Sequence, residues 1–235
     1  MSAAPLVSVV IPVRNEAPNI APLVAEIRVA LAGIPHEIIY VDDGSTDATP
    51  AILAGLAPVR WLRHRASCGQ SAAIMTGIAM AQGTWIATLD GDGQNDPADI
   101  PRLLARAQVE PGLVMVAGHR VNRQDGWVKR RSSRLANRVR SALLRDATPD
   151  TGCGLKLFHR ALFLAMPHFD HMHRFLPALA LRQGAVVLSE PVNHRPRLRG
   201  ASNYGTLDRL AVSIFDVLGV AWLQRRGKRP EIEAP

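Results

Sequence analysis

The strongest chemical signal in the sequence is a pair of carboxylates one residue apart, Asp90 and Asp92, with Gly91 between them. They follow the apolar run 85–89, which has the length and composition of a buried strand. Two carboxylates at this spacing can approach one hard divalent cation, and Gln94 adds a neutral oxygen, so we expect these three side chains to hold Mg²⁺ or Mn²⁺. A diphosphate bound to that ion would be a good leaving group. Glycine and aspartate are also typical of ordinary turns, so the rest of the chain must decide between the two interpretations.

The elements that would position this pair alternate between strand and helix. Apolar runs predict strands at residues 6–13, 36–41, 59–62 and 85–89, and apolar residues at helical spacing predict helices at 18–31, 49–56 and 69–82. Repeated strand–helix units form parallel sheets with right-handed crossovers. The sequence therefore predicts an α/β fold with a mostly parallel central sheet flanked by helices.

Polar clusters follow three of these strands, at residues 12–16, 42–47 and 90–94. Because parallel strands end at the same edge of a sheet, a nucleotide could lie across all three clusters. The backbone of the first loop could hold a base, and the carboxylate of Asp43 could accept hydrogen bonds from a base or a ribose. The sequence has none of the signature motifs of dinucleotide-binding dehydrogenases, P-loop proteins, α/β-hydrolases or zinc metalloproteases.

The second half of the chain departs from this alternation. We expect a helix at 99–108, a strand at 113–117, a loop at 118–126 that carries Arg120, and a glycine-containing loop at 150–158 that leads into a strand. Residues 129–145 contain seven basic residues and no acidic one, with leucine and valine at helical spacing, which predicts a basic amphipathic helix. We expect short helices at 161–166 and 175–183 and a last strand at 185–188.

Residues 206–224 form a long apolar stretch that is interrupted by Asp208, Arg209 and Asp216 and followed by a basic cluster at 225–229. These charges argue against a membrane span, whereas apolar bulk that ends in a tryptophan and a basic cluster is typical of a helix at a membrane interface. Packing against the core, or against a second copy of the chain in a homo-oligomer, is an equally good interpretation. The region 206–235 is therefore expected to be an interfacial or oligomerisation helix with a basic tail.

The whole-chain composition sets limits on function. A chain of 235 residues with 47% apolar residues is expected to fold as one large domain, alone or with a small appendage. The net charge of +8 suggests an anionic partner such as a nucleotide, a phospholipid headgroup or a nucleic acid. Cys68 and Cys153 form no CxxC or Cys/His pattern, which suggests a reducing compartment. There is neither a secretion signal nor an uncharged apolar run of about 18 residues. We therefore expect a cytoplasmic protein, peripheral on the cytoplasmic face of a membrane.

Seven segments between residues 7 and 205 have a characteristic order and spacing: VSVVIPVRNE, IIYVDDGSTDAT, GQSAAIMTGIAMAQG, TLDGDGQNDP, AGHRVNR, DTGCGLKLFHR and RPRLRGASNYG. Together they resemble the family 2 inverting glycosyltransferases of the GT-A fold, in the dolichol-phosphate mannosyltransferase-like branch that glycosylates polyprenyl phosphates. The resemblance implies a GT-A domain at 1–205, with a nucleotide-binding half at about 1–118 and an acceptor-binding half at about 119–205. It also implies two substrates, a GDP- or UDP-linked sugar and a polyprenyl phosphate.

The resemblance assigns roles to single residues in the donor site. It implies nucleotide or diphosphate contacts from the first loop, the second loop and the metal loop: Pro12, Arg14, Glu16, Val41, Asp43 and Gly91. It identifies the metal cluster as Asp90, Asp92 and Gln94.

The resemblance also points to cationic groups later in the chain. Arg120 and Arg197 match the arginines that bind the diphosphate or the acceptor phosphate, so we expect them to act in catalysis beside Asp90 and Asp92. Where the family commonly has a lysine in a G-x-S-K pattern, this chain has Asn203. That cationic contact is therefore missing or is supplied by Arg199.

The acceptor distinguishes two enzyme hypotheses. Transfer to a hydroxyl generally needs a carboxylate base, and family 2 polysaccharide synthases have a Glu-Asp pair for this, whereas the comparable region here, HFDHMHRFLPALALRQG, has only Asp170. A phosphate is already an anion at neutral pH, so we favour a polyprenyl phosphate as the acceptor. The alternative is a soluble glycosyltransferase that acts on a saccharide or another hydroxyl acceptor, with Asp170 or Asp150 as the base.

A non-enzymatic alternative is a basic domain that binds nucleic acid. Its motivation is the net positive charge, but aromatic residues that could stack on bases make up only 5% of the chain. We therefore expect no nucleic-acid partner.

Overall fold

The computed structural model describes residues 4–121, 140–196 and 208–227, and the side chains of the last helix from Ile214 onward. The strands are β1 (Val7–Val13), β2 (His36–Asp42), β3 (Arg60–Arg63), β4 (Trp85–Thr88), β5 (Val114–Arg120), β6 (Lys156–His159) and β7 (Val186–Val192). The helices are α1 (Ala17–Ala30), α2 (Thr49–Ala54), α3 (Gln70–Met80), α4 (Ile100–Gln108), α6 (Arg160–Leu164), α7 (Leu176–Arg182) and α8 (Asp208–Arg225). Two 3₁₀ turns complete the set, η1 (Pro97–Asp99) and η2 (Met172–Arg174).

The strands form one sheet in the order β3-β2-β1-β4-β6-β5-β7. The pairs β1/β2, β1/β4, β2/β3 and β5/β7 are parallel. Among the described strands only β6 runs the other way, and it is antiparallel to both neighbours, β4 and β5. The predicted α/β fold with a mostly parallel sheet is therefore confirmed.

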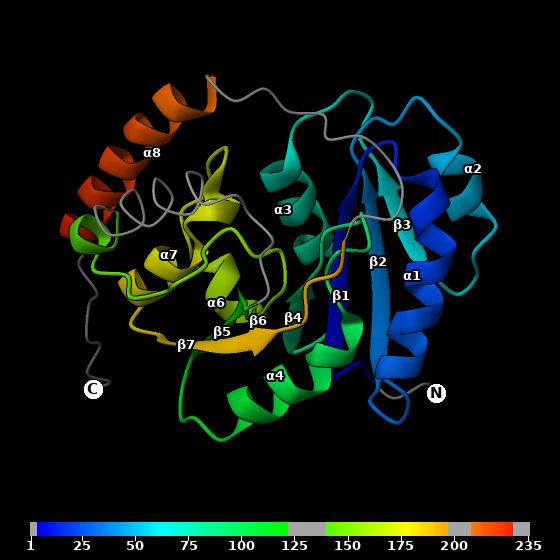
Figure 1. Cartoon of the computed structure of the whole chain (residues 1–235), viewed down its shortest axis with the longest axis horizontal. Helices are drawn as coiled ribbons and strands as arrows, with labels where there is room; N and C mark the ends of the chain where they lie inside the picture. Colours follow the sequence, from blue (N-terminus) through cyan, green and yellow to red (C-terminus); the bar gives the residue numbers. More distant parts are fainter. Residues whose placement is uncertain (1–3, 122–139, 197–207, 228–235) are drawn as a thin grey trace, which may run out of the picture.

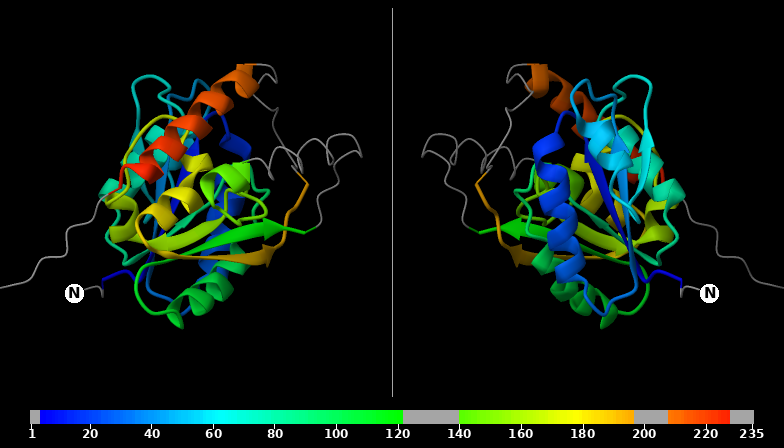
Figure 2. Two further views of the ribbon diagram at one scale, coloured as in Figure 1. Left: turned by 90° about the vertical axis from the view of Figure 1, so that its left-hand side faces the viewer. Right: turned by 90° about the vertical axis from the view of Figure 1, so that its right-hand side faces the viewer.

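Helices cover both faces of the sheet (Figures 1 and 2). α1, α2 and α4 enclose one apolar core, and α3, α6 and α7 enclose the other, with α8 lying across α7. Successive residues of β1 point to opposite faces, so Val9 belongs to the first core and Val10 to the second, both with no exposed surface. Each such buried side chain contributes roughly 1.5–3 kcal/mol to stability. The central strand is thus fixed from both sides.

The elements of the first half agree with the sequence prediction to within two residues at either end. The second half differs more. β5 extends to Arg120, beyond the predicted end at residue 117, because it pairs with β7 as far as the Arg120–Val192 position. Arg120 therefore stands at the end of a strand and not within a loop.

The predicted basic helix is only partly described, since residues 129–139 lie outside the described residues. Residues 140–144 are helical. Arg140 is not an unpaired surface cation, because its guanidinium lies 2.5 Å from Asp146, whose side chain has no exposed surface. Leu144 is buried, and Leu143 is 36% exposed. None of the described helices combines the length and the apolar character that a transmembrane span requires.

Candidate active site

The metal loop predicted from the sequence follows β4 and folds back on itself. The Asp90 N–H donates to Asn95 Oδ1 at 3.0 Å, and the Gln94 N–H donates to Asp92 Oδ1 at 3.1 Å. Gly91 is buried against the end of β1, where a Cβ atom would lie 2.4 Å from a methyl carbon of Val13. Only glycine fits at this point, and the loop is thereby held next to the first polar cluster.

The carboxylate of Asp90 lies among groups from three other parts of the chain. Its Oδ1 accepts a hydrogen bond from Gln70 Nε2 of α3 at 2.9 Å. The backbone of Gly154 lies directly against it, because a Cβ atom there would be 2.1 Å from Asp90 Oδ2. Burial raises the pKa of Asp90 and the charge of Asp92 raises it further, whereas Lys156 and Arg120 act in the opposite direction. A cation at this point would favour the ionised form.

The donor atoms of this loop fit a hard divalent cation. Asp90 and Asp92 supply carboxylate oxygens, and Gln94 keeps its amide oxygen for a further contact because its amide nitrogen donates to the backbone oxygen of Arg195 at 3.4 Å. An all-oxygen set with few protein ligands is what Mg²⁺ and Mn²⁺ prefer. A divalent cation would also offset the repulsion between the two carboxylates. The chemistry of the predicted cluster is therefore consistent with a metal site.

Arg120 reaches the same region from β5 and is held by Asp150. Its Nε and Nη2 atoms donate to the two carboxylate oxygens of Asp150 at 2.6 and 2.8 Å. Hydrogen bonding to Asp150 raises the pKa of Arg120, although burial opposes this. The pair fixes the guanidinium and leaves its remaining N–H groups for a ligand. Asp150 is engaged in this pair, which makes it a poor candidate for a general base.

The first two predicted nucleotide loops lie side by side, since Pro12 and Val41 are opposite each other in the β1/β2 register. Arg14 is exposed. The Glu16 carboxylate accepts from Asn19 Nδ2 at 2.6 Å, at the start of α1. Val41 has no exposed surface in either its backbone or its side chain, so the structure offers a nucleotide no direct contact with it.

Asp43 is turned toward its own neighbouring loop. Its carboxylate accepts four hydrogen bonds of 2.7–2.9 Å, from the His64 ring, the Ser67 hydroxyl and the N–H groups of Cys68 and Gly69. Burial opposes ionisation of Asp43, but these hydrogen bonds outweigh it and lower its pKa. The ionised form of Asp43 is therefore favoured at the sheet edge. Most of the hydrogen-bond acceptor sites of its carboxylate are already occupied by these four donors.

The sequence pattern identifies Asp43 but does not group His64 and Cys68 with it. Ligand atoms of Asp43, His64 and Cys68 lie within 4.8 Å of one another, a spacing at which a metal ion could be held. In this structure the two ring nitrogens of His64 contact Asp43 and the Thr76 hydroxyl, at 2.7 and 3.0 Å. The ring thus serves to orient the carboxylate.

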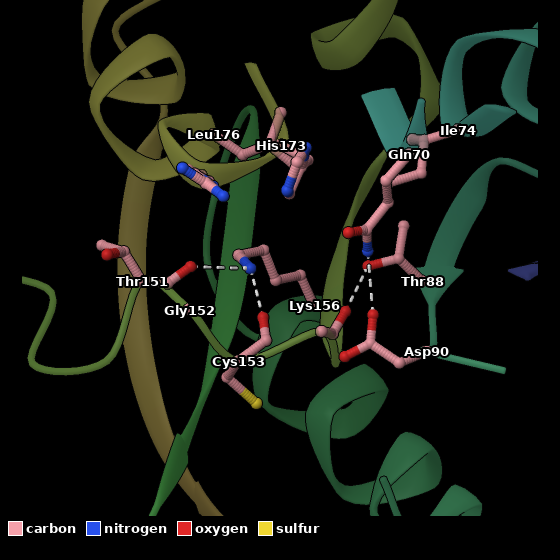
Figure 3. Close-up of a pocket in the computed structure, with 12 residues that line it drawn as sticks. Gln70, Ile74, Thr88, Asp90, Thr151, Gly152, Cys153, Lys156, His173 and Leu176 are labelled. Atoms are coloured by element: carbon pink, nitrogen blue, oxygen red, sulfur yellow. Dashed lines mark hydrogen bonds between the residues drawn. The ribbon is translucent and has the colours of Figure 1, made fainter. Parts of the chain in front are cut away.

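A pocket of about 130 Å³ lies beside Asp90 (Figure 3). Its walls come from α3, the end of β4, loop 151–154, β6 and the segment from η2 to α7. Lys156 enters from β6 and is 3% exposed, and its ammonium group donates to the backbone oxygens of Cys153 and Thr151. Burial lowers the pKa of Lys156. The sequence-based site did not include Gln70, Gly154 or Lys156.

Three predicted site residues, Arg197, Arg199 and Asn203, lie outside the described residues. The chain before them is described, and it runs beside the metal loop. The Arg195 N–H donates to the backbone oxygen of Gln94 at 2.9 Å, and its guanidinium donates to the backbone oxygen of Asn95 at 3.0 Å. The segment that follows β7 is thereby held next to the metal loop.

Comparison with known proteins gives close relatives of the chain. The sequence model of glycosyl transferase family 2 matches residues 8–165, which is more than half of the chain. Dodecaprenyl-phosphate galacturonate synthase from Rhizobium johnstonii is 36% identical over 95% of this chain and 68% of its own length. Undecaprenyl-phosphate 4-deoxy-4-formamido-L-arabinose transferase from Enterobacter sp. is 38% identical over 90% of this chain and 66% of its own length. The chain thus spans about two thirds of the length of these relatives.

Solved structures show the same fold. Glucosyl-3-phosphoglycerate synthase from Mycobacterium tuberculosis, in complex with Mn²⁺, UDP-glucose and phosphoglyceric acid, has a TM-score of 0.67 at 19% identity, covering 94% of this chain and 80% of that one. Mannosyl-3-phosphoglycerate synthase from Rubrobacter xylanophilus has a TM-score of 0.64 at 17% identity, covering 97% and 77%. The sheet and its flanking helices therefore have the GT-A glycosyltransferase arrangement. The chain belongs to glycosyl transferase family 2, as its sequence pattern predicted.

Proposed function

We propose that this chain transfers a single sugar, with inversion, from a nucleotide-diphospho-sugar to a polyprenyl phosphate. The observation that carries the proposal is the carboxylate pair Asp90/Asp92 beside a pocket at the sheet edge, in a chain whose relatives at 36–38% identity are named for polyprenyl-phosphate acceptors. Pro12, Arg14 and the loops around them would receive the nucleotide.

Asp90, Asp92 and Gln94 would hold Mg²⁺ or Mn²⁺, which when bound would offset the negative charge that develops on the departing diphosphate. Arg120, fixed by Asp150, lies close enough to Asp90 to influence its pKa, so it is placed to contribute charge to the same region. We assign the second arginine role to Arg197, supported by Arg199 and Asn203, on the sequence resemblance.

The two carboxylates that we considered as general bases are poorly placed for that role, which favours a phosphate acceptor. A phosphate oxygen needs no base to become a nucleophile, whereas a hydroxyl does. The two candidate bases are poorly suited, because Asp150 is bound to Arg120 and the Asp170 side chain is 67% exposed. A soluble acceptor remains the second candidate, and the 3-phosphoglycerate acceptors named for the fold neighbours motivate it.

Organic extraction separates the two candidates. We expect that incubation with a radiolabelled nucleotide-sugar, undecaprenyl phosphate and Mn²⁺ moves label into the organic phase, and that excess EDTA stops the transfer. The metal requirement follows from the charge on the leaving diphosphate. Label that stays in the aqueous phase on a saccharide would support the soluble acceptor, and transfer undiminished by EDTA would contradict the metal site.

A membrane surface is the second partner that we propose, with the protein peripheral on the cytoplasmic face. α8 packs on the body through Val220 and Ala221, while its opposite side exposes an apolar stripe. The stripe consists of Ile214, Phe215, Leu218 and Trp222, which are 58%, 76%, 55% and 58% exposed. Arg225 and Arg226 follow it and are exposed. Apolar side chains that end in a tryptophan and a basic pair suit an anionic interface.

Replacing the exposed stripe should weaken membrane association. We expect the triple variant Phe215→Ser, Leu218→Ser, Trp222→Ser to bind anionic liposomes roughly ten-fold or more weakly in a sedimentation assay, because it removes the apolar area that could insert. The matched control is the double variant Val29→Ser, Val109→Ser, whose valines are 77% and 74% exposed elsewhere on the surface.

Analytical ultracentrifugation tests the competing role of the stripe. If the unaltered chain is a dimer, the triple variant is a monomer and liposome binding is equal for both, then the stripe is an oligomer interface and the membrane proposal for α8 is wrong.

A further inference from the structure

His173 is held in place by a residue far away in the sequence. Its Nδ1 lies 2.8 Å from the Ser71 hydroxyl oxygen, and its backbone N–H donates to that same oxygen at 3.2 Å. Ser71 belongs to the first turn of α3 and is 1% exposed. The two contacts attach η2 to α3 and fix both the position and the rotation of the imidazole ring.

The hydrogen-bond pattern assigns the ring proton. The Ser71 hydroxyl accepts the backbone N–H of His173, and Nδ1 is its one hydrogen-bond acceptor among the described residues, so we assign the hydroxyl hydrogen to Nδ1 and the ring proton to Nε2. Burial, with smaller contributions from the charges of Arg174 and Lys156, lowers the pKa of His173 to about 3. The ring is therefore a neutral N–H donor at physiological pH and a weak base.

The free side of this ring faces the pocket. Figure 3 shows the imidazole of His173 reaching into the cavity from above, across from Lys156 and Asp90. Nε2 makes no hydrogen bond with another described residue. Arg174 also lines the pocket, and its guanidinium makes no hydrogen bond or ion pair with the described part of the chain. Two N–H donors are thus available to a ligand on the side opposite Asp90.

The rest of the pocket has a mixed polar and apolar lining. Gln70 and Thr88 supply polar groups, while Ile74 and Leu176 supply apolar surface. A sugar ring needs this combination, since it presents hydroxyl and ring oxygens at its edge and C–H groups on its faces. The pocket also adjoins Asp90, next to which a metal-bound diphosphate would carry its sugar.

We propose that this pocket is the subsite for the transferred sugar, and that His173 Nε2–H and the Arg174 guanidinium donate hydrogen bonds to its oxygen atoms. The proposal rests on the proposed function, because a nucleotide-sugar donor at the metal loop is what brings a sugar here.

Calorimetric titration with and without the sugar tests the subsite. The ligands are UDP and UDP-galacturonate, with GDP and GDP-mannose as a second pair, all in Mn²⁺. We expect His173→Leu to weaken binding of the nucleotide-sugar about five- to ten-fold and to leave binding of the matching nucleoside diphosphate unchanged. His173→Gln should retain most of the affinity, because its amide N–H can replace Nε2–H. Ser71→Ala should give an intermediate loss, since it releases the ring.

A control variant, the outcomes that would overturn the proposal and a check of folding complete the test. His168→Gln is the control, because this exposed histidine lies outside the pocket lining. Equal weakening of UDP and UDP-galacturonate, or equal effects of Leu and Gln, would give His173 a structural role only and overturn the proposal. If His173→Leu unfolds, as judged by circular dichroism, the same comparison is made with Arg174→Gln. Failure of all four nucleotides to bind the unaltered chain would overturn the proposed function itself, and the subsite with it.

Discussion

Asp92→Asn is expected to lower the rate of sugar transfer by roughly three orders of magnitude, comparable to the loss of a strong transition-state contact. The replacement removes one negative charge from the metal site and leaves the side-chain volume almost unchanged. An asparagine oxygen can still accept the hydrogen bond that Gln94 N–H now gives to Asp92 Oδ1, so the loop should keep its shape. The measurement is the transfer rate at saturating Mn²⁺, together with the melting temperature, which should change by only a few degrees at most.

Asp170→Asn is the matched control for this variant. The Asp170 side chain is 67% exposed, and its replacement should leave the transfer rate unchanged if the acceptor is a phosphate. A large loss in Asp170→Asn would instead identify a general base and favour a hydroxyl acceptor. Full activity of Asp92→Asn in saturating Mg²⁺ would remove the metal-site assignment.

Much of the fold could be predicted because the first half of the chain repeats one local unit. Strand β1 is a continuous apolar run and helix α1 has its apolar residues at helical spacing, and parallel neighbours follow from the alternation of such strands and helices. The direction of β6 could not be predicted in this way, because a strand of four residues looks alike in both orientations. The antiparallel insertion of β6 between β4 and β5 depends on tertiary contacts, which a local sequence pattern does not contain.

The candidate site could be predicted where its residues are adjacent in sequence, as in the Asp90–Gln94 loop. The supporting groups come from distant segments. Gln70 contacts Asp90 across 20 residues, and His173 contacts Ser71 across 102. No local pattern marks such residues, since a glutamine at the start of a helix and a histidine in a short turn are unremarkable on their own. The packing of α3 against the end of β4 and against η2 brings these residues together.

The charge pattern of residues 129–145 did not predict the surroundings of its basic side chains. The acid-free segment 129–145 predicted a basic amphipathic helix, yet its Arg140 pairs with buried Asp146, six residues further along the chain. The acidic partner lies just beyond the segment, so counting charges within a window missed it. In α8 the most exposed apolar side chains follow helical spacing and leave the opposite side of the helix for packing, and the partner of that exposed stripe stays a prediction.

Gly154→Ala is expected to lower kcat/KM by roughly 100-fold, the size of effect that a displacement of about 1 Å in an active site can have. The added Cβ would lie 2.1–2.6 Å from the three carboxylate atoms of Asp90, so the carboxylate must move away from its present position. The fold should survive, because Gly154 does not have a positive φ and the colliding group is the end of a side chain. Gly55→Ala is the control, since its added Cβ would lie at an ordinary 3.6 Å from the backbone oxygen of Ile52, and Gly55 follows α2, away from the site.

The mechanism of this loss can be isolated by a double-mutant cycle. If Gly154→Ala acts by displacing the Asp90 carboxylate, the variant that combines it with Asp90→Asn should be no slower than Asp90→Asn alone, because one group cannot be lost twice. Mn²⁺ affinity should fall in both single variants in parallel with the rate. Multiplication of the two losses would mean that the glycine acts on another part of the pocket, such as the Lys156 side chain or the sugar itself. In that case the 150–154 loop would shape the cavity. The position of the Asp90 carboxylate would then be determined by its hydrogen bond with Gln70 and not by contact with the Gly154 backbone.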